Sequence, residues 1–316
     1  MFEPITGAWD GNSVHSRPLR VIRRLDMGLE QALTAGAERD PDVAVGGIIW
    51  LVGWASVCAL LGIGVQLFGD AGYHSGFLTL NRLFALLPAS LWQWLTLLGD
   101  ERVALALALL LSYRHPRVFW TLLCAALVAI AYARGLKPLI DAARPPAVFP
   151  LDSFELIGAV HRKQSFPSGH SVTAAVFFGV LIYYAQQTRW RLIFLLLATA
   201  AGLSRVAVGV HWPVDVMAGL AGGALAALVG VALARRSLWG IYDPGVHLAF
   251  VVLAGFAAIG LFFDDGGYPA AARPLQVLAL AALATALAEY VLWPMTSSMV
   301  RPMIRSLWHS RSANES

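Results

Sequence analysis

Long blocks of apolar residues, separated by short polar stretches, run through most of the chain. The block at 44–68 contains no charged side chain, and it is too long and too far from the N-terminus to be a cleavable signal peptide. Because the hydrocarbon core of a bilayer is about 30 Å thick, a helix needs about 20 apolar residues to cross it. The pattern therefore predicts an integral membrane protein built as an all-α bundle of transmembrane helices. Further blocks of this kind lie at 118–136, 167–185, 192–210, 212–234, 245–263 and 274–293.

The segment 77–113 is harder to assign, because charged residues at 100–102 split it into two apolar pieces. Tryptophan prefers the headgroup level of a bilayer, so the first piece, with Pro88 and the sequence WQW at 92–94, predicts an interfacial helix. The second piece, extended backward to about Leu95, then forms a span. The chain is thus predicted to have about eight spans, with both termini on one side.

The distribution of basic residues predicts the orientation of this bundle. With the N-terminus in the cytoplasm, most of the 23 Lys and Arg residues fall in segments that stay inside. The positive-inside rule therefore favours two cytoplasmic termini. If residues 83–98 formed a full span, every later segment would change sides and the bias would largely vanish. The inside residues are Arg17, Arg20, Arg23, Arg24, Arg39, Arg114, Arg117, Arg189, Arg191, Arg235, Arg236, Arg301, Arg305 and Arg311.

Composition supports the membrane assignment and argues against other classes of protein. The 316 residues are 58% hydrophobic and 13% charged, with a net charge of +4. The basic residues stand in short clusters between apolar blocks, where they orient a chain in a bilayer, so we expect no nucleic-acid partner. Cys58 and Cys124 lie in apolar blocks, which indicates neither a disulfide framework nor a metal set. Gly219 and Gly223 form a GxxxG pair that favours helix packing inside one chain over dimerisation, and the oligomeric state stays open.

Charged residues at the predicted outer ends of the spans form three groups. The first is the sequence KPLIDAARPP at 137–146, in which Lys137 and Arg144 are seven residues apart. This distance is close to two helical turns, which would place both cations on one face of a helix, although Pro138 and Pro145 indicate that the helix is ending. Taken alone, such residues more often extend to the lipid headgroups.

The second group is the sequence SFPSGHS at 165–171, directly before an apolar block. Proline suits the first position of a helix, so Pro167 predicts a helix whose first amides, those of Ser168, Gly169 and His170, are free. A helix N-terminus binds anions, and glycine lets a phosphate approach the backbone closely. Taken alone, the group could also be a helix cap with an incidental histidine.

The third group is the sequence SRVAVGVHWPVD at 204–215. Pro213 predicts a helix start, which places Asp215 in the first turn and His211 just before it. A carboxylate there can accept the proton of one ring nitrogen of His211 and leave the other nitrogen free to attack. His211 and Asp215 could instead bind a metal, but no third ligand accompanies them at ligand spacing, so we expect no metal site.

The predicted topology brings all three groups to the same side of the membrane. One pocket could then hold three cations, two histidines, a carboxylate and a helix N-terminus. Cations and free amides suit a phosphoryl group, whose oxygens gather charge in the transition state. The two histidines suit the two sides of the phosphorus, where one attacks and the other protonates the leaving oxygen.

The three groups together resemble the signature of the type 2 phosphatidic acid phosphatase (PAP2) superfamily, which includes bacterial lipid phosphatases, glucose-6-phosphatases and vanadium haloperoxidases. The resemblance covers roughly residues 95–235. It implies that His211 is the nucleophile that forms a phosphohistidine, that Asp215 orients it, and that His170 is the general acid. It also implies phosphate binding by Lys137, Arg144, Arg205, Ser168 and the amide of Gly169, without a metal or another cofactor.

The resemblance divides the chain into four predicted parts: a cytoplasmic N-terminal segment at 1–43, a phosphatase core at 44–235, two additional transmembrane helices at 236–293 and a cytoplasmic tail at 294–316. We expect a multi-pass protein of a bacterial inner membrane with its active site facing the periplasm. The loop at about 146–166 is expected to cover the pocket.

A pocket at the membrane boundary suits a lipid whose tails remain in the bilayer. The family implies undecaprenyl pyrophosphate, phosphatidylglycerol phosphate, phosphatidic acid or a lipid A phosphate as substrate, hydrolysed at a phosphomonoester or pyrophosphate. The alternatives are a lipid phosphotransferase, for example one that acts on lipid A, a glucose-6-phosphatase-like enzyme, and a catalytically silent lipid-binding or transport protein.

Overall fold

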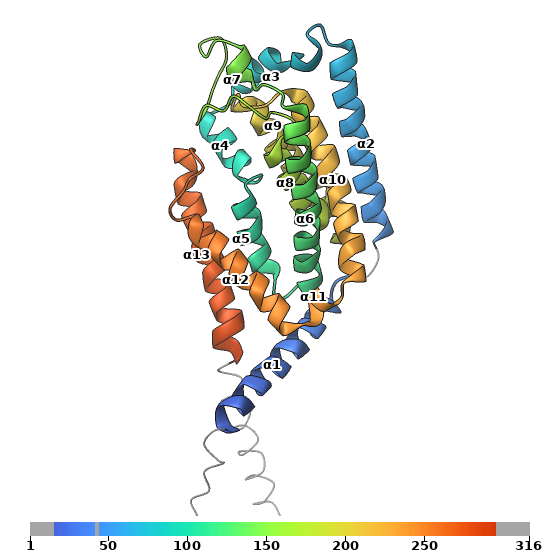
Figure 1. Cartoon of the computed structure of the whole chain (residues 1–316), viewed down its shortest axis with the longest axis vertical. Helices are drawn as coiled ribbons and strands as arrows, with labels where there is room; N and C mark the ends of the chain where they lie inside the picture. Colours follow the sequence, from blue (N-terminus) through green and yellow to red (C-terminus); the bar gives the residue numbers. More distant parts are fainter. Residues whose placement is uncertain (1–15, 42–43, 295–316) are drawn as a thin grey trace, which may run out of the picture.

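The computed structural model describes residues 16–41 and 44–294, and in these ranges every regular element is a helix (Figure 1). The all-α prediction is therefore confirmed. Five helical segments are long and apolar enough to cross a membrane, which makes the chain a multi-pass membrane protein. They are α2 (Val45–Phe68), the segment Pro116–Val148 with α6 (Pro116–Ile140) and α7 (Pro145–Val148), α9 (Thr188–Ala207), α10 (Pro213–Arg236), and the segment Pro269–Leu292 with η2 (Pro269–Ala271), α13 (Ala272–Leu287) and η3 (Ala288–Leu292).

Helix α10 lies at the centre of the bundle and packs against α2, α6, α8 (Gly169–Tyr184) and α9. Its glycines allow α8 to come close. A Cβ atom at Gly223 would lie 2.6 Å from the carbonyl oxygen of Val172, and one at Gly219 would lie 2.8 Å from that of Ser168. The GxxxG pair thus serves packing within the chain, as predicted.

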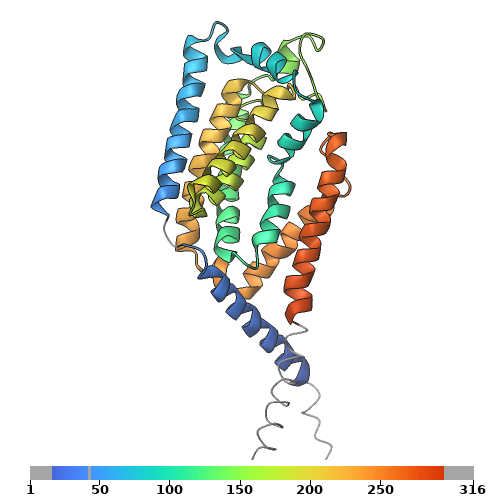
Figure 2. The same cartoon turned by 180° about the vertical axis from the view of Figure 1, so that it is seen from behind.

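The chain after α10 forms a hairpin that covers α5 (Glu101–Leu111) at one edge of the bundle, opposite α2 (Figures 1 and 2). After α11 (Trp239–Tyr242), its helices are α12 (Pro244–Gly260) and α13. Near the turn from α5 to α6, Arg114 Nε bonds Glu289 Oε1 at 2.8 Å, and the hydroxyl of Tyr290 bonds Ser112 at 2.9 Å. We call α12, its connecting loop and α13 the C-terminal hairpin.

Helix α1 (Ser16–Ala37) lies diagonally across the end of the bundle at which α11 is found (Figure 1). It packs against α6, α11 and α12, and Leu33 and Ala37 are fully buried there. This helix was not predicted, because the segment carries no apolar block long enough for a span.

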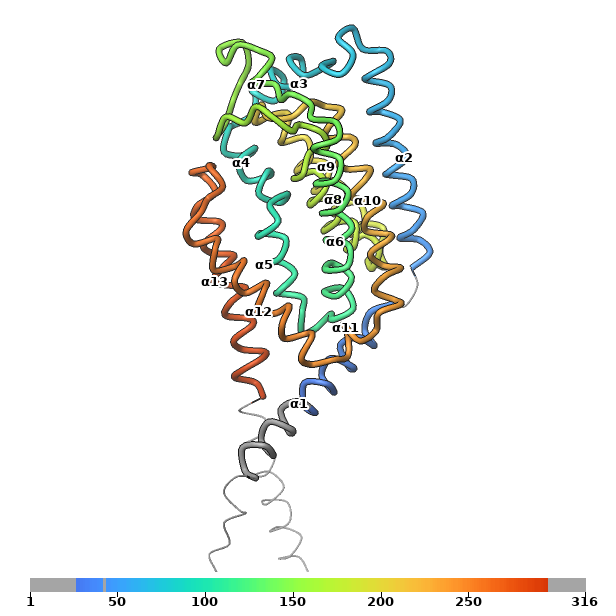
Figure 3. The backbone as a smooth tube through the Cα atoms, viewed as in Figure 1, coloured from blue at the N-terminus to red at the C-terminus, as the bar shows by residue number. Residues whose placement is uncertain are grey.

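The region 77–113 differs from its prediction. It contains α3 (Phe77–Phe84), α4 (Ala89–Leu97) and α5, so a single helix from residue 95 to 113 is wrong (Figure 3). The reason is Asp100, whose carboxylate accepts the amide of Arg102 at 2.8 Å and thereby caps a new helix. At 1.5 Å per residue, the 11 residues of α5 are about 16 Å long, roughly half of the hydrocarbon core.

Each of the eight predicted spans coincides with a helix, but α5, α8 and α12 are shorter than a full crossing, with 11, 16 and 17 residues. The count of eight spans and the orientation therefore remain predictions. The predicted tail at 294–316 lies almost wholly outside the described residues, as do Arg301, Arg305 and Arg311.

The three sequence groups do meet at one end of the bundle, the end far from α1 (Figure 1). The C-terminal end of α6, the N-terminal end of α8 and the turn from α9 to α10 all lie there. Helix α3, the 3-10 turn η1 (Gly72–His74) and the loop before α8 surround them. This end carries the candidate site.

We predict that Gly223→Val lowers the thermal unfolding midpoint by several degrees in detergent, because the added side chain forces α8 and α10 apart. Gly255→Val in α12 is the matched control, since a Cβ atom at Gly255 meets nothing within 4 Å. Equal losses in the two variants would contradict the role of Gly223 in close packing.

Candidate active site

His211 lies in the short turn between α9 and α10, and the backbone fixes its place. The carbonyl oxygen of Arg205 accepts the amides of both Val210 and His211 at 3.2 Å. Gly209 permits this turn, because its φ is +81° and a Cβ atom there would lie 2.5 Å from the carbonyl oxygen of Glu155. Pro213 then begins α10, as predicted, so that Asp215 falls in the first turn.

Asp215 is fully buried, and its carboxylate is the centre of a hydrogen-bond network. Its Oδ2 lies 3.2 Å from His211 Nδ1 and accepts the backbone amide of Trp212 at 3.0 Å. The hydroxyls of Ser165 and Tyr73 also donate to the carboxylate, to Oδ2 and Oδ1 respectively. The predicted pairing of His211 with Asp215 is thus formed, with four donors holding the acid in place.

Ser165 and Tyr73 were not predicted from the sequence as members of the site. Ser165 stands three residues before Ser168, inside the quoted SFPSGHS, but nothing in that sequence shows which serine faces the carboxylate. Tyr73 belongs to the polar link after α2, 142 positions from Asp215, and no spacing connects the two.

Arg144 contacts the edge of the His211 imidazole opposite Asp215, at Nε2. Its Nη1 lies 3.1 Å from His211 Nε2, while its Nε donates to the carbonyl oxygen of Lys163 at 2.8 Å. Because a guanidinium only donates, Nε2 carries a lone pair, and the ring proton belongs on Nδ1, facing Asp215. This is the tautomer that a nucleophilic Nε2 requires.

The pKa of His211 is lowered well below its ordinary value, chiefly by burial and then by the positive charges of Arg144, Arg205 and Lys137. Both causes disfavour the imidazolium, so the ring is neutral at pH 7. The same surroundings also lower the pKa of His161 in the loop before α8.

The start of α8 differs from its prediction in two details. The hydroxyl of Ser168 accepts the amide of Ser171 at 3.4 Å and thereby caps the helix, so that α8 begins at Gly169 and Pro167 stays outside it. The amide of Ser168 is not free, because it donates to the carbonyl oxygen of Asp215 at 3.2 Å. This bond ties the start of α8 to the start of α10.

The amides of Gly169 and His170 have no acceptor within α8, since they belong to its first turn. A Cβ atom at Gly169 would meet nothing within 4 Å, so the backbone there faces open space. Such a glycine leaves room for an anion at the helix end.

The other two predicted cations lie at helix ends that meet at the site. Lys137 lies in the last turn of α6 and Arg205 in the last turn of α9. Arg205 is 3% exposed, and its Nη1 donates to the hydroxyls of Thr96 at 2.6 Å and Tyr268 at 2.9 Å. Its Nε is buried and has no hydrogen-bond partner among the described residues. The structure thus assembles all the residues that the sequence predicted for the site.

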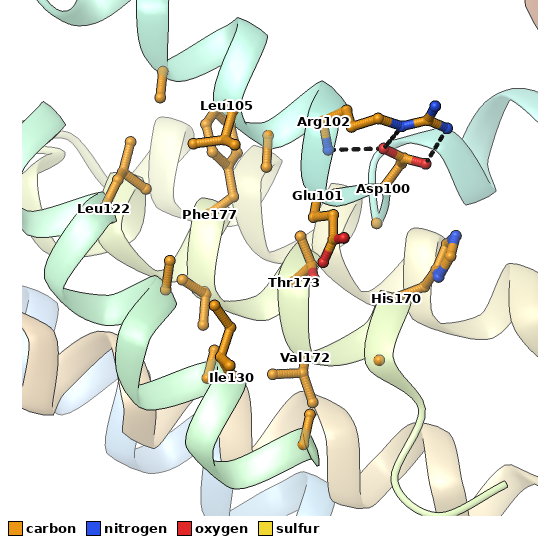
Figure 4. Close-up of a pocket in the computed structure, with 18 of the residues that line it drawn as sticks. Asp100, Glu101, Arg102, Leu105, Leu122, Ile130, His170, Val172, Thr173 and Phe177 are labelled. Atoms are coloured by element: carbon orange, nitrogen blue, oxygen red, sulfur yellow. Dashed lines mark hydrogen bonds and ion pairs between the residues drawn. The ribbon is translucent and has the colours of Figure 1, made fainter. Parts of the chain in front are cut away.

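A cavity of about 660 Å³ leads away from this site between α5, α6 and α8 (Figure 4). Lys137, Gly169 and His170 line its polar end, together with charged residues at the start of α5. The rest of the lining is mostly apolar and follows the three helices down the bundle. It includes Leu105, Leu122, Ala126, Ile130, Val176 and Phe177. We call this cavity the apolar groove.

The described ranges, 16–41 and 44–294, contain no cluster of three or more His, Cys, Asp or Glu side chains that could hold a metal ion. The arrangement offers a neutral histidine whose Nε2 lone pair faces Arg144, a second histidine, three cations and a helix N-terminus.

Comparison with known proteins identifies this arrangement. Residues 117–239, which contain every predicted site residue, match the PAP2 superfamily. The match confirms the resemblance stated from the three sequence groups.

Two curated proteins illustrate the relationship. A lipid A 1-phosphatase of Rhizobium johnstonii is 36% identical over 136 residues, which cover 42% of this chain and 53% of the relative. An undecaprenyl-diphosphatase of Sulfolobus acidocaldarius is 29% identical over 161 residues, covering 50% of this chain and 72% of the relative. A second lipid A 1-phosphatase, from Rhizobium etli, is covered to 56%. The chain thus spans about half the length of the two lipid A 1-phosphatases.

Among solved structures, the crystal structure of Aquifex aeolicus LpxE is similar, with 25% sequence identity and a TM-score of 0.42. The match covers 49% of this chain and 94% of that one.

We predict that the acidic limb of the pH profile of kcat/KM lies below the ordinary histidine pKa of about 6.5, since protonation of His211 would remove the attacking lone pair. Lys137→Met should move this limb toward higher pH, because the lost cation no longer opposes protonation. Lys163→Met is the matched control and should leave the limb in place, because Lys163 is exposed and is not among the groups that lower the pKa of His211. A limb that stays fixed in Lys137→Met would contradict the electrostatic cause.

Proposed function

We propose that this protein is an integral membrane phosphatase that hydrolyses the phosphomonoester or pyrophosphate of a lipid through a phosphohistidine on His211. The observation that carries the proposal is the state of His211. Its Nδ1 faces Asp215, its Nε2 lone pair faces Arg144, and the first turn of α8 lies beside it. The relatives' names, a lipid A 1-phosphatase and an undecaprenyl-diphosphatase, support the same reaction class.

In the first step, Nε2 of His211 attacks the phosphorus, and the bond from phosphorus to the leaving oxygen breaks. His170 gives its proton to that oxygen. In the second step, His170 takes a proton from water, whose oxygen attacks the phosphohistidine and releases inorganic phosphate and the free imidazole. Asp215 stabilises the charge that develops on the ring of His211.

The phosphoryl oxygens are held by Lys137, Arg144, Arg205 and the amides of Gly169 and His170. Ser168 acts in this proposal by capping α8, which directs those amides toward the phosphate. The positive charges take over the stabilisation that Mg²⁺ supplies in other phosphoryl transfers.

The apolar groove supports a lipid rather than a water-soluble ester. It starts at His170 and Lys137 and continues between α5, α6 and α8 along apolar side chains, so a lipid chain can occupy it while the headgroup reaches His211. The substrates that fit the relatives' names are a lipid A phosphate and undecaprenyl pyrophosphate. Phosphatidylglycerol phosphate and phosphatidic acid belong to the same chemical class.

We further propose eight spans with cytoplasmic termini, in a bacterial inner membrane, and an active site that faces the periplasm. The support is the excess of basic residues in the segments on the side away from the site. A phosphotransferase shares the phosphohistidine and differs only in the acceptor, which is another lipid instead of water.

The first test is phosphate release by the purified protein in detergent, from undecaprenyl pyrophosphate, phosphatidylglycerol phosphate, phosphatidic acid, a lipid A phosphate and glucose 6-phosphate. We expect release from at least one lipid, inhibition by vanadate, and a loss of at least about 10³-fold in His211→Ala. His170→Ala should still form some phosphoenzyme from nitrophenyl phosphate, whose leaving group needs no proton. Turnover that survives in His211→Ala would rule out the phosphohistidine.

The second test separates lipid substrates from soluble ones. Ala126→Phe places a ring in the apolar groove, so it should raise KM for a long-chain lipid phosphate about tenfold while nitrophenyl phosphate is hydrolysed as before. Leu127→Phe is the matched control, because Leu127 is 67% exposed and lies outside the groove. Equal effects of Ala126→Phe on both substrates would place the lipid chain elsewhere.

A further inference from the structure

The C-terminal hairpin lies outside the segment that matches the PAP2 superfamily, yet its connecting loop reaches the candidate site. Tyr268 stands in this loop, between α12 and η2, and is 6% exposed. Its hydroxyl oxygen accepts a hydrogen bond of 2.9 Å from Nη1 of Arg205. A segment outside the family match therefore contacts one of the proposed phosphate-binding cations.

Helix α4 fixes both sides of this contact. Thr96, near the end of α4, accepts a second hydrogen bond from the same Nη1 atom, at 2.6 Å. Earlier in α4, Gln93 Oε1 accepts the amide of Ala270 at 3.0 Å, and Trp94 Nε1 donates to the carbonyl oxygen of Ala270 at 2.9 Å. Helix α4 therefore anchors the loop at Ala270, two residues after Tyr268.

The loop before α8 packs against the ring of Tyr268. Gly158 has a φ of +88°, and a Cβ atom there would lie 2.9 Å from the ring of Tyr268. Arg102, at the start of α5, forms a salt bridge of 2.8 Å with Asp264 of the hairpin loop. The hairpin loop is thus anchored to α4, to α5 and to the loop that surrounds the site.

We propose that Tyr268 is a positioning residue for Arg205, so that the C-terminal hairpin completes the phosphate pocket. This inference rests on the proposed function. Thr96 and Tyr268 accept both hydrogens of Nη1, which fixes the plane of the guanidinium. Its other edge, formed by Nε and Nη2, is the one that can bind two phosphoryl oxygens at once. The buried Nε, which has no partner among the described residues, belongs to this edge.

The hydroxyl of Tyr268 is neutral, so it holds Arg205 without cancelling its charge. A carboxylate in the same place would bind the guanidinium more strongly but would compete with the phosphate. Loss of the hydroxyl leaves a buried, charged N–H without its acceptor, and the guanidinium is then free to turn.

The test is Tyr268→Phe in the full-length protein, with kcat/KM for the best lipid substrate and inhibition by vanadate as readouts. We expect kcat/KM to fall about tenfold to hundredfold and vanadate to bind more weakly by a similar factor. Tyr290→Phe is the matched control. It removes a half-buried hydroxyl from η3, which continues α13 far from the site, where Tyr290 contacts His247 and Ser112. In this variant kcat/KM should stay within about twofold.

A double-mutant cycle separates positioning from simple packing. Tyr268→Phe should cost nothing further in an Arg205→Ala background, because the side chain that it positions is gone. The proposal is overturned if Tyr268→Phe matches the wild type, or if it lowers kcat/KM by the same factor with and without Arg205.

The two proposals fail in different ways. If the wild type releases no phosphate from any substrate, the proposed function fails, and Tyr268 is then judged by vanadate binding alone, measured as a shift in thermal unfolding. Weaker vanadate binding in Tyr268→Phe would still support the positioning role, and unchanged binding would overturn it.

Discussion

The carboxylate of Asp215 is the interaction on which the rest of the site depends. It is fully buried, and it accepts hydrogen bonds from groups in three separate parts of the chain: the link after α2, the loop before α8 and the turn that carries His211. A buried carboxylate is costly unless it is fully hydrogen-bonded, so these segments can reach their places only together. The orientation of His211 is therefore a property of the whole end of the bundle.

A second constraint is that the guanidinium groups of Arg144 and Arg205 donate to neutral acceptors and to no carboxylate among the described residues. The guanidinium of Arg144 is bonded to the carbonyl oxygens of Lys163, Gln164 and Val210, and that of Arg205 to two hydroxyls. Neutral acceptors satisfy the donors and leave the charge available. The positive field that results acts together with burial, the larger cause, to keep the His211 ring neutral.

The sequence alone predicts the helical bundle and the residues that meet at one end of it, because both depend on local patterns. Apolar blocks locate the helices, and Pro213 fixes the register of α10 and the place of Asp215. The prediction from sequence fails where contacts between distant segments determine the structure. Asp100 caps a new helix where the predicted span runs through it from about Leu95, and Tyr73 and Tyr268 contribute single hydroxyls from links with no recognisable spacing.

In the proposed mechanism, the contact between Arg144 and His211 would guard the nucleophile in the absence of substrate. A lone pair that accepts a guanidinium N–H is shielded from solvent protons and from stray metal ions. An arriving phosphate would compete for that same guanidinium and draw Arg144 toward its own oxygens. The substrate itself would then release the reactivity of His211, at the moment when a phosphorus lies beside it.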